Sequence, residues 1–211
     1  MGSPGRWDAG QQGVQAGDPA VAAQQEIAAR HWQAARALAH DLMEGGLAGT
    51  GQVWGVVLEP GERFISDVQC DYARYYGAQV EYRHSNGFFF GPLPFVVLAL
   101  GANAIGNASR RSAAQRAAMT QWREFQQVRV IVTDRRLLCQ RADGVWLSFY
   151  YRGAHALYPE AGNWSLVLDY PETSPVRFGG WGAPIAAVAA VWALYGKDGL
   201  RDHPGLAPLR G

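Results

Sequence analysis

The sequence VRVIVTDRRLLCQRADGVWLSFYY, residues 128–151, is the stretch that decides the fold. Its β-branched residues alternate with other residues up to residues 133–136, where an Asp that can hydrogen-bond its own backbone favours a tight turn. A second turn follows at residues 142–144, because Asp-Gly supplies the positive φ that turns between right-twisted strands require. Hydrophobic residues then recur at every second position over residues 145–151. The stretch therefore predicts three antiparallel strands in a meander.

Length and composition bound the class of protein. The chain has 211 residues, 48% hydrophobic and 18% charged, which suffices for one domain with a core and additional helices. The formal net charge of +1 provides no global field that would select nucleic acid or an acidic substrate. Residues 1–17 are rich in Gly and Gln and contain no apolar run typical of a signal peptide. We expect a cytoplasmic protein in which these residues form a disordered tail.

The segments around the meander predict two helices and further strands. Asp and Pro at the start and two glycines at the end bound an apolar stripe of helical period, so we expect an N-terminal helix over residues 18–46. A nearly uncharged helix over residues 183–196 would close the domain, followed by a flexible tail at residues 197–211. The other strands are expected at residues 50–59, 63–69, 80–84, 164–170 and 176–178.

An insert over residues 85–127 begins with an apolar stretch. No charged residue occurs between residues 85 and 109, and the stretch is long enough to be considered as a bilayer span. Glycines, prolines and asparagines interrupt it, and a span would place the strands on its two sides on opposite faces of a membrane. We therefore expect a buried glycine-rich helical insert; the alternatives are an interfacial or re-entrant membrane element and, third, a single span.

Residues 109–127 predict a basic amphipathic helix at the end of the insert. Its arginines lie off an apolar stripe, a pattern that an anionic membrane attracts with about 1 kcal/mol per basic residue. A helix face that is merely solvated is the alternative interpretation. The candidate lipid- or partner-binding residues of the insert are Arg110, Arg111, Arg116, Arg123, Phe88, Phe89, Phe90 and Phe95.

The sequence contains no pattern typical of a catalytic or metal site. His31 and His40 are nine residues apart and would face opposite sides of a helix, so they cannot share a metal ion. Cys70 and Cys139 lie far apart in expected strands, and we expect both to be buried thiols. No serine stands in a Gly-x-Ser-x-Gly motif, and no glycine-rich phosphate loop precedes a helix. We therefore expect neither enzymatic activity nor a cofactor.

Several segments together resemble a known family. They are LEPGERFISDVQ at 58–69, VRVIVTDRRLLCQ at 128–140, DGVWLSF at 143–149, LVLDY at 166–170 and ALYG at 193–196. In these segments the chain resembles bacterial PH-like and GRAM-like domains, particularly actinobacterial ones, and we place the domain at residues 50–196. The resemblance implies an α+β fold, a bent antiparallel β-barrel or sandwich closed by a C-terminal helix. The N-terminal helix and the helical insert would be additions to it.

The resemblance and the insert predict a non-enzymatic binding module that associates peripherally with anionic lipid at the inner face of the cell membrane. The alternative is a protein-interaction module, in which the apolar insert packs on a partner protein or on a second copy of the chain, since its small residues would allow close approach. Nucleic acid is not expected as a partner, because aromatic residues at strand spacing are typical of a core and no broad basic surface accompanies them.

Overall fold

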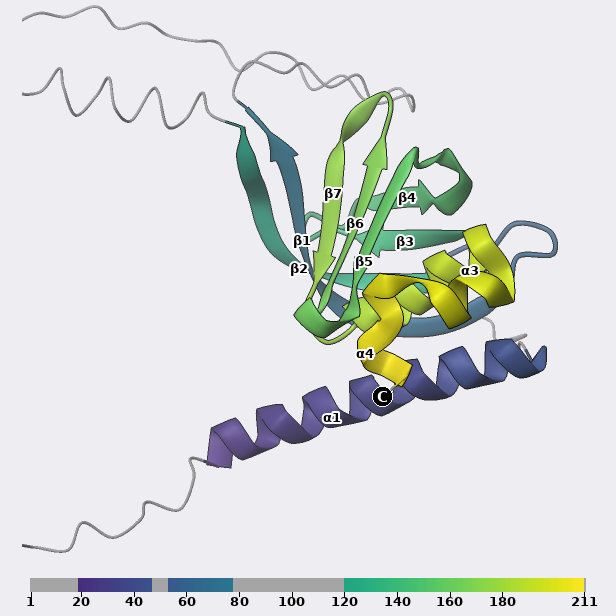
Figure 1. Cartoon of the computed structure of the whole chain (residues 1–211). Helices are drawn as coiled ribbons and strands as arrows, with labels where there is room; N and C mark the ends of the chain where they lie inside the picture. Colours follow the sequence, from purple (N-terminus) through teal and green to yellow (C-terminus); the bar gives the residue numbers. More distant parts are fainter. Residues whose placement is uncertain (1–18, 47–52, 78–119, 211) are drawn as a thin grey trace, which may run out of the picture.

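A curled antiparallel sheet forms the body of the protein, with helices against one end of it (Figure 1). The computed structural model describes residues 19–46, 53–77 and 120–210. The α+β class that the sequence predicts is confirmed. The strands of this part of the chain are β1 (Phe64–Tyr76), β2 (Gln121–Thr133), β3 (Arg136–Gln140), β4 (Trp146–Tyr150), β5 (Ala156–Glu160), β6 (Ser165–Tyr170) and β7 (Thr173–Gly179). Its α-helices are α1 (Pro19–Glu44), α3 (Ala183–Asp202) and α4 (Ala207–Arg210), and its 3-10 helices are η1 (Tyr151–Gly153), η2 (Ala161–Asn163) and η3 (Pro204–Leu206).

The predicted meander is confirmed as β2, β3 and β4, which pair antiparallel in chain order. Val130 pairs with Cys139, so the buried residues of the two strands face the same side of the sheet. The second turn forms as its Asp-Gly predicts: Gly144 has a φ of 82°, and the backbone N–H of Val145 donates to Asp143 Oδ1 at 3.1 Å. The local sequence is therefore sufficient to explain the meander from residue 128 onward.

β1 joins the meander to the other half of the sheet, and the strand order is β4-β3-β2-β1-β7-β6-β5. It pairs with β2 over its length and with β7 through residues 71–74. Tyr72 pairs with Gln126 but Arg74 pairs with Arg123, so the extra residue of a bulge lies in β2, where Glu124 has a φ of 58°. Such a bulge bends the strand and increases its twist. The concave side is filled by the rings of Tyr72, Phe149 and Phe178, whose centroids lie 5.4, 6.0 and 6.5 Å apart. The curled sheet thus encloses an aromatic core.

α3 closes one end of this core, as expected for a C-terminal helix. Its first nine residues, 183–191, are all buried, and it packs against β5 and β6. Gly182 allows the helix to start close to β1, since an added Cβ would stand 2.6 Å from the carbonyl oxygen of Gln69. Proline at residue 184 suits the first turn of the helix.

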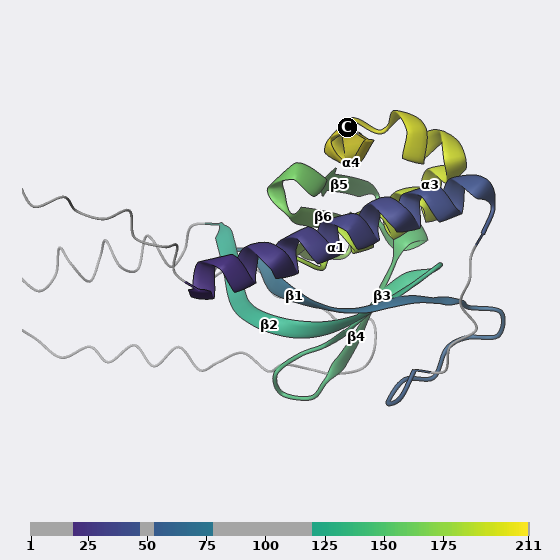
Figure 2. The same ribbon diagram turned by 90° about the horizontal axis from the view of Figure 1, so that it is seen from below.

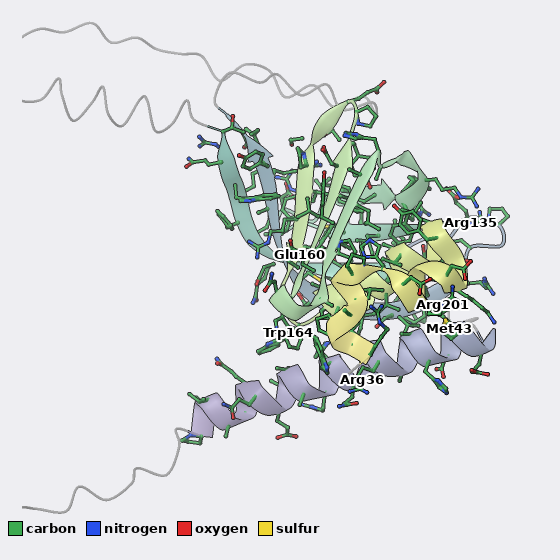
Figure 3. The ribbon with its side chains drawn as sticks, in the orientation of Figure 1. Arg36, Met43, Arg135, Glu160, Trp164 and Arg201 are labelled. Carbon is green, nitrogen blue, oxygen red and sulfur yellow. The ribbon has the colours of Figure 1, made fainter. Side chains whose placement is uncertain are left out.

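α1 runs along the helical end of the molecule and contacts α3 and α4 (Figure 2). Trp32 of α1 lies against Trp164, with ring centroids 5.2 Å apart, and Figure 3 shows Trp164 directed toward the helix. Ala35 and Leu42 are buried, whereas Val21 in the first turn is 49% exposed. The predicted N-terminal helix is therefore confirmed, and its later turns provide most of its buried surface.

Two predicted elements are wrong where the structure describes them. Residues 53–59, the end of the expected strand at 50–59, form an irregular loop. Two of the backbone carbonyl groups of this loop accept hydrogen bonds from arginine side chains of β2 and β3, and not from a neighbouring strand. Residues 121–127, the end of the expected helix at 109–127, belong to β2, because pairing with β1 outweighs the helical spacing of their apolar residues.

The C-terminal tail also differs from its prediction. Residues 197–210, expected to be flexible, continue α3 and form η3 and α4, because Leu200, Leu206 and Leu209 are buried among polar neighbours. β5 was missed because Pro159 obscures it; as the edge strand, β5 tolerates proline. The expected tail at residues 1–17, the strand at 80–84 and residues 85–119 of the insert lie outside the described residues.

A substitution at Gly205 tests how closely η3 packs against β5. A Cβ added at Gly205 would lie 1.7 Å from the carbonyl oxygen of Pro159, so Gly205→Ala must separate η3 from β5. We expect this variant to lower the free energy of unfolding by about 1–3 kcal/mol, as overpacking usually does, measured by urea unfolding. Gly153→Ala is the matched control, because its Cβ would meet only the Tyr170 ring, at 3.6 Å. Equal stability of the two variants would contradict the close packing.

Candidate functional site

The loop of residues 53–63, called the 53–63 loop below, lies alongside the β2–β3 hairpin and is fixed there by Glu62. The Glu62 side chain is fully buried and accepts two hydrogen bonds from Arg136, Nε to Oε1 at 2.9 Å and Nη2 to Oε2 at 2.8 Å. Thr133 Oγ1 donates to Oε1 at 2.8 Å, and the backbone N–H of Glu59 donates to Oε2 at 2.7 Å. Both carboxylate oxygens are therefore satisfied within one buried network.

This network sets the charge state of Glu62. Burial alone would raise the pKa of Glu62, because it disfavours the carboxylate. The hydrogen bonds from Arg136, the Glu59 backbone and Thr133, together with the Arg136 charge, outweigh burial and hold the pKa of Glu62 below its ordinary value of 4.5. The carboxylate is thus ionised at neutral pH, and it pairs with an arginine whose side chain is only 9% exposed.

Arg136 extends the network to β4 and back to the 53–63 loop. Its Nη1 donates to Ser148 Oγ at 3.2 Å and to the Tyr150 hydroxyl at 2.8 Å, and its guanidinium lies 5.0 Å from the centroid of the Tyr150 ring. The Tyr150 hydroxyl in turn donates to Glu59 Oε1. This contact with the Glu59 carboxylate raises the pKa of Tyr150, so the phenol stays protonated. The loop is therefore bound to two strands.

A second clamp holds the end of the 53–63 loop. Asp134 accepts from Arg63 twice, from the backbone N–H at 2.9 Å and from Nε at 3.0 Å, and its own N–H donates to the Arg63 carbonyl at 3.0 Å. The Arg63 guanidinium also lies 5.8 Å from the centroid of the Trp192 ring of α3. The turn at residues 134–135 is therefore tied to both the loop and the closing helix.

A groove of about 690 Å³ lies between this loop, η1 and α3. Figure 3 shows Arg135 at this side of α3. Six of the residues that line the groove determine its chemistry: Glu59, Arg135, Tyr150, Arg152, Trp192 and Gly196. Gly196 has a φ of 62° and interrupts the helical backbone of α3. The groove therefore combines an aromatic wall with charged side chains from three elements.

The charges of the groove are unequally matched. Glu59 accepts from Tyr150 and lies 3.4 Å from Arg135, and Asp134 is engaged by Arg63. Arg152, at the exposed tip of η1, has no hydrogen bond or ion pair within the described part of the chain. The carboxylates are thus already neutralised and Arg152 is not, an arrangement that suits an anionic ligand.

The 53–63 loop also exposes two apolar side chains. Trp54 is 89% exposed and Val57 is 90% exposed, the largest exposed fractions of any large hydrophobic residue in the described part of the chain. Their carbonyl oxygens accept from Arg129 Nη1 and Arg136 Nη2, each at 3.5 Å. The backbone of the loop is therefore attached to the sheet while the two side chains face the surroundings.

A second hollow of about 670 Å³ lies between α1 and β1. The rings of His31 and Trp181 line it, 6.5 Å apart, and burial together with the Arg30 charge lowers the pKa of His31. Its carboxylates are Asp67, which is paired with Arg129 at 2.6 Å, and Asp71. We see no convergent set of groups in it, so the groove beside α3 is the better candidate site.

The structure describes one of the residues that the sequence nominates for lipid or partner binding. Arg123 lies in β2, not in a helix, because its strand pairs with β1; its Nε donates to the Tyr76 carbonyl at 3.0 Å and its guanidinium lies 5.7 Å from the Tyr76 ring. The other nominated residues lie outside the described residues: Arg110, Arg111, Arg116, Phe88, Phe89, Phe90 and Phe95.

The prediction for the two cysteines is confirmed. Cys70 and Cys139 are buried free thiols; burial raises both pKa values, that of Cys139 to about 12, so neither is a reactive thiolate. His31 is partly buried and His40 is exposed. Within the described residues, no group of three or more His, Cys, Asp or Glu side chains could hold a metal ion. None of the helices described is both long and apolar enough to cross a bilayer.

Sequence reasoning missed the residues that form the site. The expected strand at 50–59 includes Trp54 and Val57, although the glycines at 51 and 55 and the Pro-Gly at 60–61 are signals for a loop. The sequence places Arg135 and Arg136 in a turn and indicates no further role for them. Arg152 follows directly on the predicted strand, and its place beside α3 depends on tertiary packing that no local pattern contains.

The Glu62–Arg136 pair predicts a large cost for removing one charge. Glu62→Gln leaves the buried Arg136 without its carboxylate, and we expect a loss of about 3 kcal/mol or more in the free energy of unfolding. Glu59→Gln is the matched control: Glu59 is 39% exposed, so its ion pairs should contribute about 1 kcal/mol or less. Urea unfolding measures both. Similar losses would mean that burial of the pair does not stabilise the loop.

The lowered pKa of Glu62 also predicts a pH dependence. Because the folded pKa lies below the ordinary value of 4.5, folding favours the carboxylate, and this stabilisation is fully present above pH 4.5. It is lost as the pH falls through the folded pKa. We expect the wild-type protein to lose stability more steeply than Glu62→Gln below pH 4.5, measured by unfolding at a series of pH values. Parallel curves for the two proteins would contradict the assignment.

Comparison of the chain with protein-family models gives no match, and comparison with curated proteins and with solved structures gives none either.

Proposed function

We propose that the chain is a non-enzymatic binding module that associates peripherally with anionic membrane surfaces through the 53–63 loop. One observation carries the proposal: Trp54 and Val57 are about nine-tenths exposed on a loop whose backbone is clamped to the sheet. Tryptophan is enriched at membrane–water interfaces, where its ring is apolar and its N–H remains hydrated. A fixed loop loses little conformational entropy when it inserts.

The charges near the 53–63 loop favour an anionic surface. Arg135 and Arg152 line the groove next to the loop, and Arg152 is not neutralised within the described residues. Each basic residue near an anionic surface contributes about 1 kcal/mol, whereas burying a large apolar side chain contributes about 1.5–3 kcal/mol. The apolar side chains therefore supply most of the binding, and the arginines supply the preference for anionic lipid.

The sequence resemblance supports the same function. The curled antiparallel sheet with a helix at one end is compatible with a PH-like architecture, which the resemblance to PH-like and GRAM-like domains also implies. Arg110, Arg111 and Arg116 remain part of the proposal as further cationic contacts. Arg123 is not, because its guanidinium contacts Tyr76 within the sheet.

Vesicle co-sedimentation tests the role of the loop. With vesicles of phosphatidylcholine and phosphatidylserine, we expect Trp54→Ser with Val57→Ser to lower the partition coefficient roughly tenfold or more, because two apolar anchors are lost. Tyr158→Ser is the control, since Tyr158 is a 55% exposed aromatic residue on the edge strand β5. Wild-type binding should weaken with salt but persist. Unchanged binding by the double variant would exclude the loop as the membrane anchor.

A protein-interaction module is the second candidate function, and the same exposed tryptophan favours it. Tryptophan is enriched among the residues that dominate protein interfaces. Under this function the wild-type protein would show no vesicle binding. It would form a dimer or larger assembly in light scattering, and the double substitution at Trp54 and Val57 would return it to a monomer. A monomeric protein that binds vesicles would exclude self-association through the loop.

A further inference from the structure

β1 carries a buried arginine that has no acidic partner. Arg74 is 5% exposed and lies on the concave side of the sheet, over the rings of Phe149 and Tyr72 at 5.1 and 5.8 Å. Within the described residues it makes no ion pair with a carboxylate. A buried charge without a counter-charge is costly, and an anion would stabilise this charge further than its contacts with the two rings do.

The hydrogen bonds of Arg74 are all to neutral groups. Its Nε donates to the Tyr72 hydroxyl at 2.6 Å, and its Nη1 donates to the Ser174 carbonyl at 2.8 Å and to Thr173 Oγ1 at 3.3 Å. No acceptor for Nη2 occurs among the described residues. These contacts fix the guanidinium in one orientation and leave donor capacity on Nη2.

A second arginine with an unused donor faces the same side of the sheet. Arg141 directly follows β3 and continues the alternation of Leu137 and Cys139, which are buried on the concave side. Its Nε is buried and has no hydrogen-bond partner among the described residues, while its Nη2 lies 3.1 Å from Asp143 Oδ2. Buried donors are nearly always satisfied, so an unused one indicates that an acceptor is missing.

The two arginines lie in the same neighbourhood. The backbone N–H of Ala142, next to Arg141, donates to Gln126 Oε1 at 2.9 Å. Gln126 pairs with Tyr72 across β1 and β2, and the Tyr72 hydroxyl accepts from Arg74. Around them, Gln126, Tyr170 and Thr173 are only partly buried. These three residues and the two arginines are called the mouth below. Tyr170 and Thr173 flank the β6–β7 turn, which lies at the end of the sheet away from α3 (Figure 1). Their partial exposure gives a small ligand access.

We propose that the mouth binds a small oxyanion, a phosphate or a carboxylate, between Arg74 and Arg141. An oxyanion offers several acceptor lone pairs, and charge-assisted hydrogen bonds from guanidinium groups are about twice as strong as neutral ones. The free donors Nη2 of Arg74 and Nε of Arg141 match this requirement, and the anion supplies the missing counter-charge. This site is separate from the groove beside α3 and does not depend on membrane association.

Thermal unfolding in phosphate tests the site. We expect sodium phosphate to raise the Tm of the wild-type protein relative to sodium chloride of equal ionic strength. At a concentration about a hundredfold above the Kd of phosphate for the mouth, the increase should be about 5 °C or more. Arg74→Met and Arg141→Gln should each abolish most of this shift. Arg177→Gln is the matched control, because Arg177 is an arginine of β7 that alternates with the buried Val176 and Phe178.

Two results would overturn the proposal. One is a wild-type protein that responds to phosphate no more than to chloride; the other is an Arg74→Met variant that keeps the full shift. Arg74→Met should remain folded, because it removes a charge whose burial is costly, and its Tm without phosphate should equal or exceed that of the wild type. Arg141→Gln provides an independent check, since its side chain is 23% exposed and its loss is easily tolerated.

A competition experiment distinguishes the source of the anion. If the anion is a lipid headgroup, inorganic phosphate should displace the protein from phosphatidylserine vesicles, and Arg74→Met should bind these vesicles more weakly. If it is a free anion, Arg74→Met should bind vesicles as the wild type does and still lose the phosphate shift. The variant with Trp54→Ser and Val57→Ser should keep the phosphate shift in either case, so failure of one proposal does not imply failure of the other.

Discussion

The pairing of β1 with β2 on one side and with β7 on the other is the constraint on which the rest of the structure depends. No other strand of the described sheet connects the β2–β3–β4 meander to β5, β6 and β7. The bulge of β2 opposite Tyr72 and Arg74 bends the β1–β2 pair, so that the two halves curl toward one another and their aromatic residues meet. The same strand therefore determines the core, the end that α3 closes and the opposite end, which no described helix covers.

The two ends of the sheet present different side chains to a ligand, because different residues remain outside the hydrophobic core at each end. Near α3, the Glu62–Arg136 pair fixes the 53–63 loop, and Trp54 and Val57 have no core position to fill. Rigid presentation of apolar side chains is favourable for binding a surface, since the ordering entropy is already lost in the free protein. At the end away from α3, the inward-facing positions of the described strands include the polar residues Arg74 and Gln126.

Local patterns predict the elements of this fold better than they predict its site. The period-two residues and the Asp143-Gly144 turn are sufficient for the meander, and the apolar stripes are sufficient for α1 and α3. By contrast, the helical spacing of apolar residues around Trp122 predicts a helix, which is wrong because pairing with β1 makes that segment a strand. The site depends on Glu62 and Arg136, which are 74 residues apart in the chain, and no local pattern indicates that they meet.

Comparison of the two buried arginines gives the strongest physical reason for a ligand at the mouth. Arg136 is 7% exposed and has a carboxylate on two of its nitrogens, whereas Arg74 is 5% exposed and has only hydroxyl and carbonyl acceptors within the described residues. If Arg74 served packing alone, methionine would fill the same space over Phe149 and Tyr72 without the cost of a buried charge. The charge therefore needs an explanation outside the fold, and an anion that binds there supplies it.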